Sequence, residues 1–381
     1  MIPNRTSTHD TLRVGAEMDT PPPASYVPNL KWSVNQPTSN GVSTMKNSLI
    51  SIDLAKNVFQ VCAMDDDQKI VFNKKVTRKK LLHTLCQFEP TTVIMEACYT
   101  SHPWGRAIQA LGHTVKLIPP YQVKPFVVGN KNDHNDAIAI AEASRRPKAS
   151  FVPVKTLEQQ DLQSLQRIRE RSIKHRTATG NQLRGLLAEY GIVLPKGLGN
   201  LRAEVPSILE DASQPLTVVA RGFIQRLYRE LIEHDKRINE IEAELLGLLE
   251  HNEDYQRLLT IPGIGPVIAS LILASVGDAG YFKNGRQMAA WIGLAPRQHA
   301  SGEKSRMVGI SKRGDQTLRK MLIHGARTVL NWCGSKDDKL SLWLKALSSR
   351  AHPCKVIVAL ANKLARIAWA VLATGKPYQV N

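Results

Sequence analysis

Four acidic residues occupy positions from which they could bind divalent cations. Asp53 ends an apolar run typical of a first β-strand, and Glu96 ends a later apolar run. Asp133 and Asp136 lie three residues apart near the start of a predicted helix, and this spacing puts both on one helical face. Four carboxylates close together repel one another unless cations lie between them, and oxygen-only ligands suit Mg²⁺ or Mn²⁺. The set therefore predicts a metal pair that holds a phosphodiester and activates a nucleophile.

Each acid taken singly also has a structural interpretation. Asp136 is in a position to cap a helix or to interact with its dipole. Asp53 is open to interpretation as a buried structural carboxylate, although such a group needs a partner to offset the cost of burial. The neighbouring acids at 65–67 are typical of a solvated hairpin turn rather than of a ligand set. The four acids together are more specific than any one of them.

A basic, glycine-bearing loop in the last third of the chain supplies a second candidate group. A hydroxyl among many cations is well placed to attack a phosphodiester, because the cations hold the phosphate and offset charge in the transition state. The residues alone leave three candidates open, Ser301, Ser305 and Ser311, and a loop whose serines only hydrogen-bond DNA is the alternative. The cations of this loop are Arg297, Lys304, Arg306, Lys312, Arg313, Arg319 and Lys320.

A glycine-containing turn precedes the apolar helix predicted from Val267 to Val276. The segment Ile261-Pro262-Gly263-Ile264-Gly265-Pro266 is typical of the hairpin in a helix-hairpin-helix element. Gly263 and Gly265 would let backbone N–H groups approach a phosphate at the start of the next helix, without reading bases. A simple tight turn between two helices is the alternative.

The elements that must position these groups form an α/β region followed by a helical one. The order β-β-β-α-β-α-β, with a further helix from Asp133 to Ser144, is typical of an RNase H-like fold, a mixed sheet flanked by helices. In such a sheet the first strand is central and the later acid-bearing strand lies beside it, so the four carboxylates could converge. The predicted strands cover residues 49–53, 58–64, 70–76, 92–96 and 115–118, and the predicted helices cover residues 78–88 and 104–111.

We predict four regions along the chain. Residues 1–46 form a disordered leader within which Met45 is a candidate start, and residues 47–153 form the α/β domain. Residues 154–251 form a long helical, coiled-coil linker interrupted by a Gly- and Pro-rich segment over 195–215, and residues 252–381 form a mostly helical C-terminal domain with an apolar face on its last helix (Val356, Leu360, Leu364, Ile367 and Val371).

The coiled-coil prediction rests on a heptad pattern from residue 224 onward. It is consistent with either an antiparallel helical hairpin or a coiled coil between subunits. One seam position holds Ile224, Leu231, Ile238 and Leu245, and the other holds Leu227, His234, Ile241 and Leu248.

Composition narrows the classes of partner. The chain has 51 Lys and Arg against 33 Asp and Glu, a formal net charge of +18. Such an excess predicts a polyanionic partner, above all nucleic acid, and disfavours a metabolic enzyme acting on small neutral molecules. No apolar run approaches the roughly 18 uncharged residues that a membrane span needs. Five scattered cysteines without a CxxC pair indicate neither a disulfide framework nor a zinc site, and favour a reducing cytoplasm.

Seven short motifs in this order resemble one known family. The chain is similar to the DEDD-type transposases and recombinases of bacterial insertion sequences that include the Piv/MooV DNA invertases, in which an RNase H-like (RuvC-like) domain precedes a serine-bearing transposase domain. The resemblance covers roughly residues 47–375. The motifs are Ser51-Ile52-Asp53-Leu54-Ala55-Lys56, Met95-Glu96-Ala97, Asn132-Asp133-His134-Asn135-Asp136-Ala137, Ile261-Pro262-Gly263-Ile264-Gly265-Pro266, Gly293-Leu294-Ala295-Pro296-Arg297, Ser301-Gly302 and Ile310-Ser311-Lys312-Arg313-Gly314.

The resemblance implies a role for each group. The acids Asp53, Glu96, Asp133 and Asp136 would be the catalytic, metal-binding tetrad, and Ser301 the nucleophile that bonds transiently to DNA. It also implies a circular double-stranded intermediate, and dimers that assemble into a tetramer in which one subunit's RuvC-like site meets another's serine. A noncoding RNA encoded by the element would guide the choice of DNA. Independently of the resemblance, the glycine turn and the basic loop predict nucleic-acid contacts by Gly263, Gly265, Arg297, Lys304, Arg306, Lys312 and Arg313.

Three functions therefore stand at this stage. The first is an RNA-guided, Mg²⁺-dependent DNA recombinase of the bacterial cytoplasm and nucleoid, which uses a serine nucleophile. The second is a metal-dependent, structure-selective nuclease, which needs the four acids but not Ser301. The third is a non-catalytic nucleic-acid-binding protein, for which Asp53→Asn and Glu96→Gln would change no activity.

Overall fold

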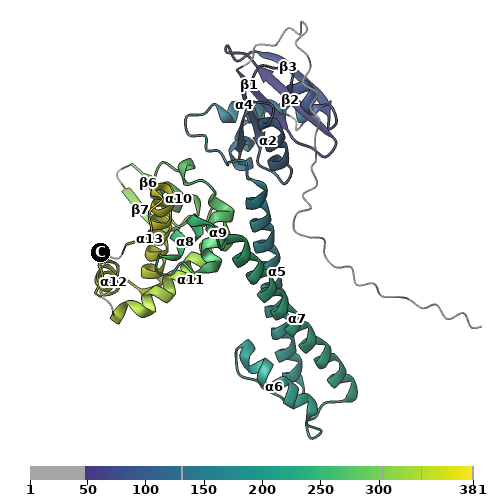
Figure 1. Ribbon diagram of the computed structural model, residues 1–381, viewed down its shortest axis with the longest axis vertical. Helices are drawn as coiled ribbons and strands as arrows, with labels where there is room; N and C mark the ends of the chain where they lie inside the picture. The colour runs from purple at the N-terminus through teal and green to yellow at the C-terminus, as the bar shows by residue number, and fades with distance from the viewer. Residues whose placement is uncertain (1–47, 130–131, 303, 336, 380–381) are drawn as a thin grey trace, which may run out of the picture. The chain divides into compact units, whose positions relative to one another are not determined.

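The computed structural model describes residues 48–129, 132–302, 304–335 and 337–379. The protein is a mixed α/β chain in which helices predominate (Figure 1). The predicted leader over residues 1–46 lies outside the described residues. The three other predicted regions are considered below in chain order.

The N-terminal sheet has the strand order β3-β2-β1-β4-β5. β1 pairs antiparallel with β2 and parallel with β4, β2 pairs antiparallel with β3, and β4 pairs parallel with β5. β1 is therefore central and β4 lies beside it, as the sequence predicts, and the sheet is compatible with an RNase H-like domain. The strands are β1 (Leu49–Asp53), β2 (Val58–Met64), β3 (Ile70–Thr77), β4 (Thr92–Glu96) and β5 (Thr114–Ile118).

Helices contact the two faces of this sheet through alternate strand positions. Phe59 of β2 meets Trp104 of α2 (Ser101–Gln109) edge to face, with ring centroids 5.2 Å apart. On the other face, Cys62 and Met64 pack in one core cluster with α4 (Asp133–Ser144). α4 has the predicted bounds, whereas α1 (Leu81–Leu85) is shorter than the predicted helix 78–88. The cations at 78–80 explain this, because positive charge is unfavourable at a helix N-terminus.

The middle region is an antiparallel pair of long helices, α5 (Leu157–Glu189) and α7 (Val218–Leu249). Ion pairs Arg169–Glu242 and Arg176–Asp235 run in opposite chain directions along the pair. One predicted seam is buried throughout, from Ile224 to Leu245, but Leu248 of the other is 57% exposed. α7 thus packs on α5 of the same chain, which favours the hairpin interpretation; coiled-coil geometry stays a prediction.

The Gly- and Pro-rich segment over 195–215 contains a helix that the sequence analysis did not foresee, α6 (Leu198–Glu210), at one end of the α5–α7 pair (Figure 1). Leu201 and Val205 are fully buried, so tertiary burial outweighs the low helix propensity of the segment. Pro206 lies inside α6 and donates no hydrogen bond to Arg202, four residues earlier. The Tyr228 hydroxyl donates to that carbonyl instead, at 3.2 Å.

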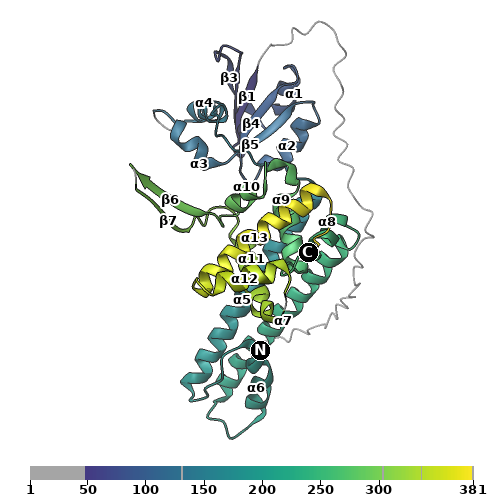
Figure 2. The same ribbon diagram turned by 90° about the vertical axis from the view of Figure 1, so that its left-hand side faces the viewer.

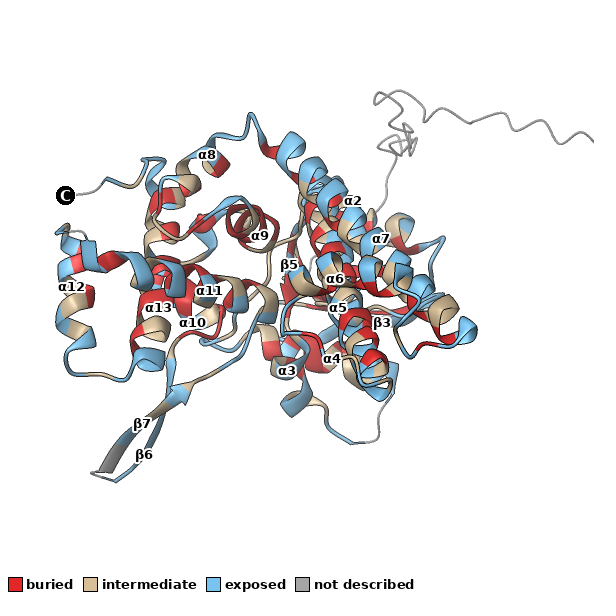
Figure 3. Cartoon of the chain, turned by 90° about the horizontal axis from the view of Figure 1, so that it is seen from below, coloured by how far each residue is buried: buried red, intermediate tan, exposed pale blue. Residues whose placement is uncertain are grey.

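The C-terminal region is helical around one apolar core. α9 is buried along almost its whole length (Figure 3), and α10, α11 and α13 pack around the same core. The elements are α8 (Glu253–Leu259), α9 (Pro266–Val276), α10 (Gly285–Trp291), β6 (Pro296–Ser301), β7 (Lys304–Ile310), α11 (Gln316–Trp332), α12 (Lys339–Ser348) and α13 (Pro353–Thr374).

α13 is, among the described residues, the one helix long and apolar enough to cross a membrane by length and composition alone. Its predicted apolar face explains this composition. Val356, Leu360 and Leu364 are fully buried in the core that α9 also forms, and Ile367 is half-buried. The rest of the helix carries Lys363 and other charged residues. α13 is therefore the core helix of this region.

Candidate carboxylate site and serine hairpin

Two of the four predicted metal-binding acids lie at adjacent strand ends. β1 and β4 pair in parallel with Ile52 opposite Met95. Asp53 and Glu96 are the next and last residues of these two neighbouring strands. Neighbouring strands lie about 4.8 Å apart, and opposed residues point to the same face of the sheet. The side chains of both acids are partly exposed. The register therefore brings Asp53 and Glu96 together.

A buried hydrogen bond fixes α4 over this edge of the sheet. The hydroxyl of Ser51 is fully buried and donates to the carbonyl oxygen of Ala137 at 2.7 Å. Ser51 precedes Asp53 by two residues and so shares its face, while Asp136 immediately precedes Ala137. This contact holds the first turn of α4 over the face that carries Asp53 and Glu96.

The remaining two acids lie in that first turn. Asn132 caps α4 by accepting a hydrogen bond from the Asn135 amide at 2.8 Å, and Asp133 and Asp136 follow the cap. The Asp133 carboxylate also forms an exposed ion pair with Lys75 of β3, at 3.2 Å. In the part of the chain that is described, no three Asp, Glu, His or Cys side chains are close enough to hold one metal ion. The fold thus gathers the four acids in one region without closing them around a single point.

The donor chemistry of this region fits a hard cation. Cys62 faces the same core as α4, but burial raises the pKa of its thiol to about 11. A neutral, fully buried thiol is a poor metal ligand, since the thiolate is the form that binds. The carboxylates are therefore the fitting ligands, and oxygen ligands select Mg²⁺ or Mn²⁺ rather than zinc.

The predicted basic loop is a two-stranded hairpin rather than an irregular loop. β6 and β7 pair antiparallel with Ser301 opposite Lys304, and Figure 2 shows the hairpin extending from the helices of this region. The turn begins at Gly302, whose φ of +55° is a conformation that glycine readily adopts. Every residue of β6 is exposed. Ser301 is therefore an accessible residue at the hairpin tip.

The base of the hairpin is fixed to the helical core. The Ser311 amide donates to Ala295 at 2.9 Å, and the Arg319 guanidinium donates to the carbonyls of Ile292 and Arg313, both at 2.9 Å. Arg319 is only 8% exposed. This residue, one of the predicted phosphate-facing cations, therefore holds the hairpin base instead.

Lys320, also among the predicted cations, contacts Glu170 of α5 at 2.7 Å. The exposed cations of the set, Arg297, Arg306, Lys312 and Arg313, form no ion pair among the residues that the structure describes. Lys304 lies opposite Ser301 in the register, and Ser305 lies opposite Ala300. Ser311 lies at the hairpin base, so the position of Ser301 is the more accessible one.

His299 is a residue of this site that the sequence analysis missed. It lies two positions before Ser301 on β6 and opposite Arg306 of β7, so the three residues share one face of the hairpin. The sequence carries no periodic signal for it, because Arg297, Gln298 and His299 are three consecutive polar residues. Only the strand pairing of β6 with β7 shows that His299 and Ser301 share a face.

The two predicted phosphate-binding glycines differ in their surroundings. Gly263 has a φ of +80°, and a Cβ there would lie 2.8 Å from the carbonyl oxygen of Gly325 in α11. Gly263 therefore permits close packing of the turn on α11. Gly265, the residue before α9, has open space where a Cβ would lie, so its backbone is the freer of the two to meet a phosphate.

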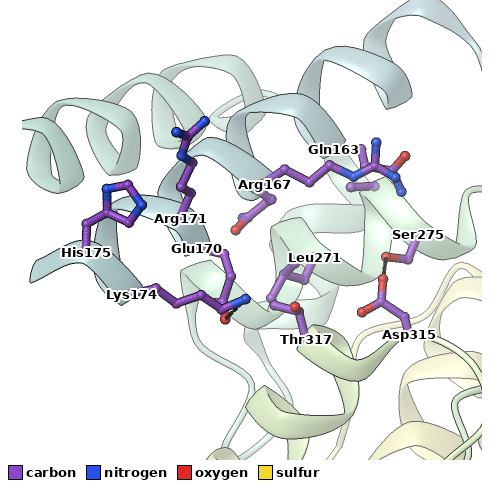
Figure 4. A pocket seen from close by; sticks show the side chains of 12 residues that line it. Gln163, Arg167, Glu170, Arg171, Lys174, His175, Leu271, Ser275, Asp315 and Thr317 are labelled. Atoms are coloured by element: carbon purple, nitrogen blue, oxygen red, sulfur yellow. Dashed lines mark hydrogen bonds and ion pairs between the residues drawn. The ribbon is translucent and has the colours of Figure 1, made fainter. Parts of the chain in front are cut away.

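A basic hollow of about 360 Å³ lies between α5, α9 and the start of α11 (Figure 4). Arg167, Arg171 and Lys174 line it from one face of α5, and Ser275 and Asp315 line its other side. Lys174 contacts Glu170 at 4.0 Å, whereas Arg167 and Arg171 form no ion pair within the described part of the chain. The i, i+4, i+7 spacing of these cations was the signal that the sequence analysis overlooked.

Comparison with known proteins gives consistent matches over both regions. Residues 255–340 match the family described as "Transposase IS116/IS110/IS902 family", and residues 50–192 match a DEDD transposase family of the IS110 type. The chain is 45% identical over 331 residues to a transposase for insertion sequence element IS1111A of Coxiella burnetii, covering 87% of this chain and 91% of the relative.

Two further relatives extend the comparison. A probable family 20 transposase of Pseudomonas aeruginosa is 44% identical over 336 residues, 88% of this chain and 99% of the relative. A pilin gene-inverting protein of Moraxella bovis is 25% identical over 357 residues, 88% of this chain and 98% of the relative. The similarity thus spans the sheet, the long helices and the C-terminal region.

Proposed function

Since the chain belongs to the IS116/IS110/IS902 family of transposases, we propose that it cuts and rejoins DNA with two separate groups of its own, a carboxylate-bound Mg²⁺ pair and the Ser301 hydroxyl. As a transposase of an insertion sequence it binds DNA and breaks and rejoins its strands. The serine, the metal and a guide RNA are the specific elements of the proposal.

The observation that carries the proposal is the strand register at the edge of the sheet. Asp53 and Glu96 are the last residues of two adjacent parallel strands, β1 and β4. Ser51 holds the acidic first turn of α4 over the same face. Nothing in the packing of a structural sheet calls for four acids at one edge in a chain of net charge +18. A phosphodiester-cleaving site with bound cations accounts for them.

The acids Asp53, Glu96, Asp133 and Asp136 would hold the cations. When bound, Mg²⁺ offsets the charge that develops on the transferring phosphate. The protein's own contribution is to keep Asp53 and Glu96 in register and to hold α4 above them. The Lys75–Asp133 ion pair supplies positive charge beside Asp133 before a cation enters.

The nucleophile would be Ser301. Attack of its Oγ on phosphorus forms a serine–phosphate bond and breaks one P–O bond of the DNA backbone. The departing deoxyribose hydroxyl takes up a proton, and Oγ loses one. His299, on the same hairpin face as Ser301, would receive that proton, while Arg306 and Arg297 would hold the phosphate.

Nucleic acid would contact the chain at several basic surfaces. The hairpin cations, among them Lys304 and the exposed Lys312 and Arg313, would bind DNA backbone together with the turn at Gly263 and Gly265. The α5 hollow lined by Arg167 and Arg171 offers a further phosphate site for DNA or for an element-encoded guide RNA.

The assembly would be a homodimer that forms a tetramer, with the α5–α7 pair contributing coiled-coil contacts. In this arrangement the hairpin of one subunit delivers Ser301 to the carboxylates of another. An exposed hairpin tip suits such delivery, because the serine remains free of contacts within its own core. The bacterial relatives suggest a cytoplasmic enzyme acting on the nucleoid.

A recombination assay on a donor plasmid tests the proposal against its alternatives. Ser301→Ala is expected to abolish strand exchange, and Asp53→Asn to abolish both cleavage and exchange. If the protein were a nuclease that needs only the acids, its Ser301→Ala variant would still cleave DNA. A non-catalytic binding protein would show no activity in any form, and its DNA binding would be unchanged by Asp53→Asn or Glu96→Gln.

A further inference from the structure

Gln60 lies beside Asp53 in the sheet and has no role in the proposal so far. β1 and β2 pair with Asp53 directly opposite Gln60, and β2 and β3 pair with Gln60 opposite Lys75. Opposed residues share a face, so Gln60 points toward the side of the sheet that α4 covers. The row across the sheet therefore runs Glu96, Asp53, Gln60 and Lys75, and three of these four side chains are charged.

Gln60 is the buried member of this row, with 4% of its surface exposed. Its Nε2 donates to Oδ1 of Asn73, and the Asn73 amide lies 3.4 Å from Nε2 of His134, in the first turn of α4. Gln60 is thereby linked through one side chain to the helix that carries Asp133 and Asp136. This chain of contacts fixes the amide plane of Gln60.

The other polar atom of this amide has no partner. Oε1 of Gln60 is buried and accepts no hydrogen bond within the described part of the chain. A buried acceptor without a donor carries a desolvation cost that an apolar side chain of the same shape avoids. The neighbouring buried positions on this face, Cys62 and Met64, are indeed apolar. The orphaned oxygen is therefore able to accept a hydrogen bond from a donor outside the described part of the chain.

The chemistry beside Gln60 identifies that donor. Carboxylates only accept hydrogen bonds when ionised, so Asp53 cannot supply one. A hydrated cation can, because Mg²⁺ keeps several of its waters when it binds and each water donates two hydrogen bonds. We propose that Gln60 is a positioning residue of the carboxylate site, whose Oε1 accepts a hydrogen bond from the hydration shell of the cation beside Asp53.

This inference rests on the proposed metal site and adds a residue to it. Residues that hydrogen-bond to the ligands of a bound metal commonly raise the metal affinity about 10- to 100-fold. Gln60 also couples the cation to α4, since the same amide contacts Asn73 and through it His134. Entry of the cation would thus strengthen the link between the sheet and the helix that supplies two of the acids.

Mn²⁺ binding, followed by electron paramagnetic resonance of the full chain, tests the inference. Gln60→Leu removes the acceptor at nearly constant volume and is expected to weaken Mn²⁺ binding about tenfold. In the metal-free variant, removal of the orphaned acceptor offsets loss of the hydrogen bond to Asn73, so its urea midpoint should stay close to that of the wild type. Gln60→Glu retains an oxygen, and its Mn²⁺ affinity should equal or exceed that of the wild type.

Gln166→Leu is the matched control. Gln166 is also 4% exposed, but its amide is satisfied by Ser270 at 2.7 Å in the helical region. This control should bind Mn²⁺ as the wild type does. Wild-type Mn²⁺ affinity in Gln60→Leu, or an equal loss of Mn²⁺ affinity in both glutamine variants, would overturn the role of Gln60 but leave the metal site standing. If the wild type bound no Mn²⁺, or if Asp53→Asn bound it equally well, the metal site itself would be refuted.

Discussion

The carboxylate edge and the serine hairpin are built in opposite ways. The carboxylate edge stands on a packed core, with Ser51 fully buried and hydrogen-bonded to α4. The hairpin carries Ser301 on an exposed strand, and Arg319 fixes the hairpin base to the helical core. The fold therefore preorganises the carboxylate edge and leaves Ser301 accessible; under the proposed function, the first group would act in place and the second would be presented to a partner subunit. Changes beneath the first should therefore cost stability, and changes along the second should cost function alone.

The largest expected effect separates the two regions directly. Ile140 of α4 is fully buried in the core below the carboxylates, and Ile140→Ala should destabilise the protein by about 3 kcal/mol through lost burial and a cavity. Met307 of β7 is 60% exposed, so Met307→Ala should change stability by less than about 0.5 kcal/mol. Urea unfolding followed by circular dichroism compares them. Equal losses would mean that the hairpin is part of the folded core.

The base of the hairpin should behave like a core, unlike its tip. Arg319→Met removes a buried hydrogen bond to Ile292 and a partly buried one to Arg313, at a cost of about 2 kcal/mol. It should also reduce strand exchange, because the hairpin is no longer held in place, while Mn²⁺ binding stays unchanged. Arg313→Ala, at an exposed position, is the control and should weaken DNA binding without loss of stability. Reduced Mn²⁺ affinity in Arg319→Met would show that the two regions are not independent.

Much of this arrangement could be predicted from the sequence, and the reasons for the exceptions are physical. The bounds of α4 follow from the cap at Asn132 and the acids after it, and the strands follow from their apolar runs. α6 was missed because the burial of Leu201 outweighs the low helix propensity of a segment rich in Gly and Pro. The hairpin was taken for a loop because the exposed β6 shows no apolar alternation. The position of Gln60 beside Asp53 follows from the pairing register of separate strands, which cannot be deduced from any one segment of the sequence.

A smaller effect tests how the carboxylate edge is held. Ser51→Ala removes the hydrogen bond to Ala137 and should cost about 1 kcal/mol, with weaker Mn²⁺ binding although no acid is altered. The Ser144 hydroxyl also donates at 2.7 Å, but to Ala141 within α4 itself. Ser144→Ala should leave Mn²⁺ affinity unchanged. Calorimetric titration of both variants measures this difference, and identical titrations would remove Ser51 from the account.

A pH-dependent effect of similar size concerns the joint between the sheet region and α5. His102 accepts a hydrogen bond from the Lys155 amide at 3.2 Å, and burial together with nearby Lys155 and Arg106 lowers the pKa of its ring from 6.5 to about 4. Because the folded pKa lies below the unfolded value, stability is full above pH 6.5 and is lost as the pH falls toward 4.

For this half-buried ring the loss should be about 1 kcal/mol after solvent screening. Urea midpoints at pH 7.5 and pH 5 measure it, with His102→Gln as the variant that lacks the titrating group. A wild-type midpoint that falls no further than that of His102→Gln would contradict the assignment.

The most direct test of the two-group account is to identify the residue that becomes bonded to DNA. Wild-type protein is incubated with element-end DNA and Mg²⁺, the mixture is digested with trypsin, and the DNA-linked peptide is sequenced by mass spectrometry. A phosphate is expected on Ser301 and should be absent from Ser301→Ala and from Asp53→Asn. A linkage to Ser305 or Ser311, or full recombination without any protein–DNA bond, would contradict it.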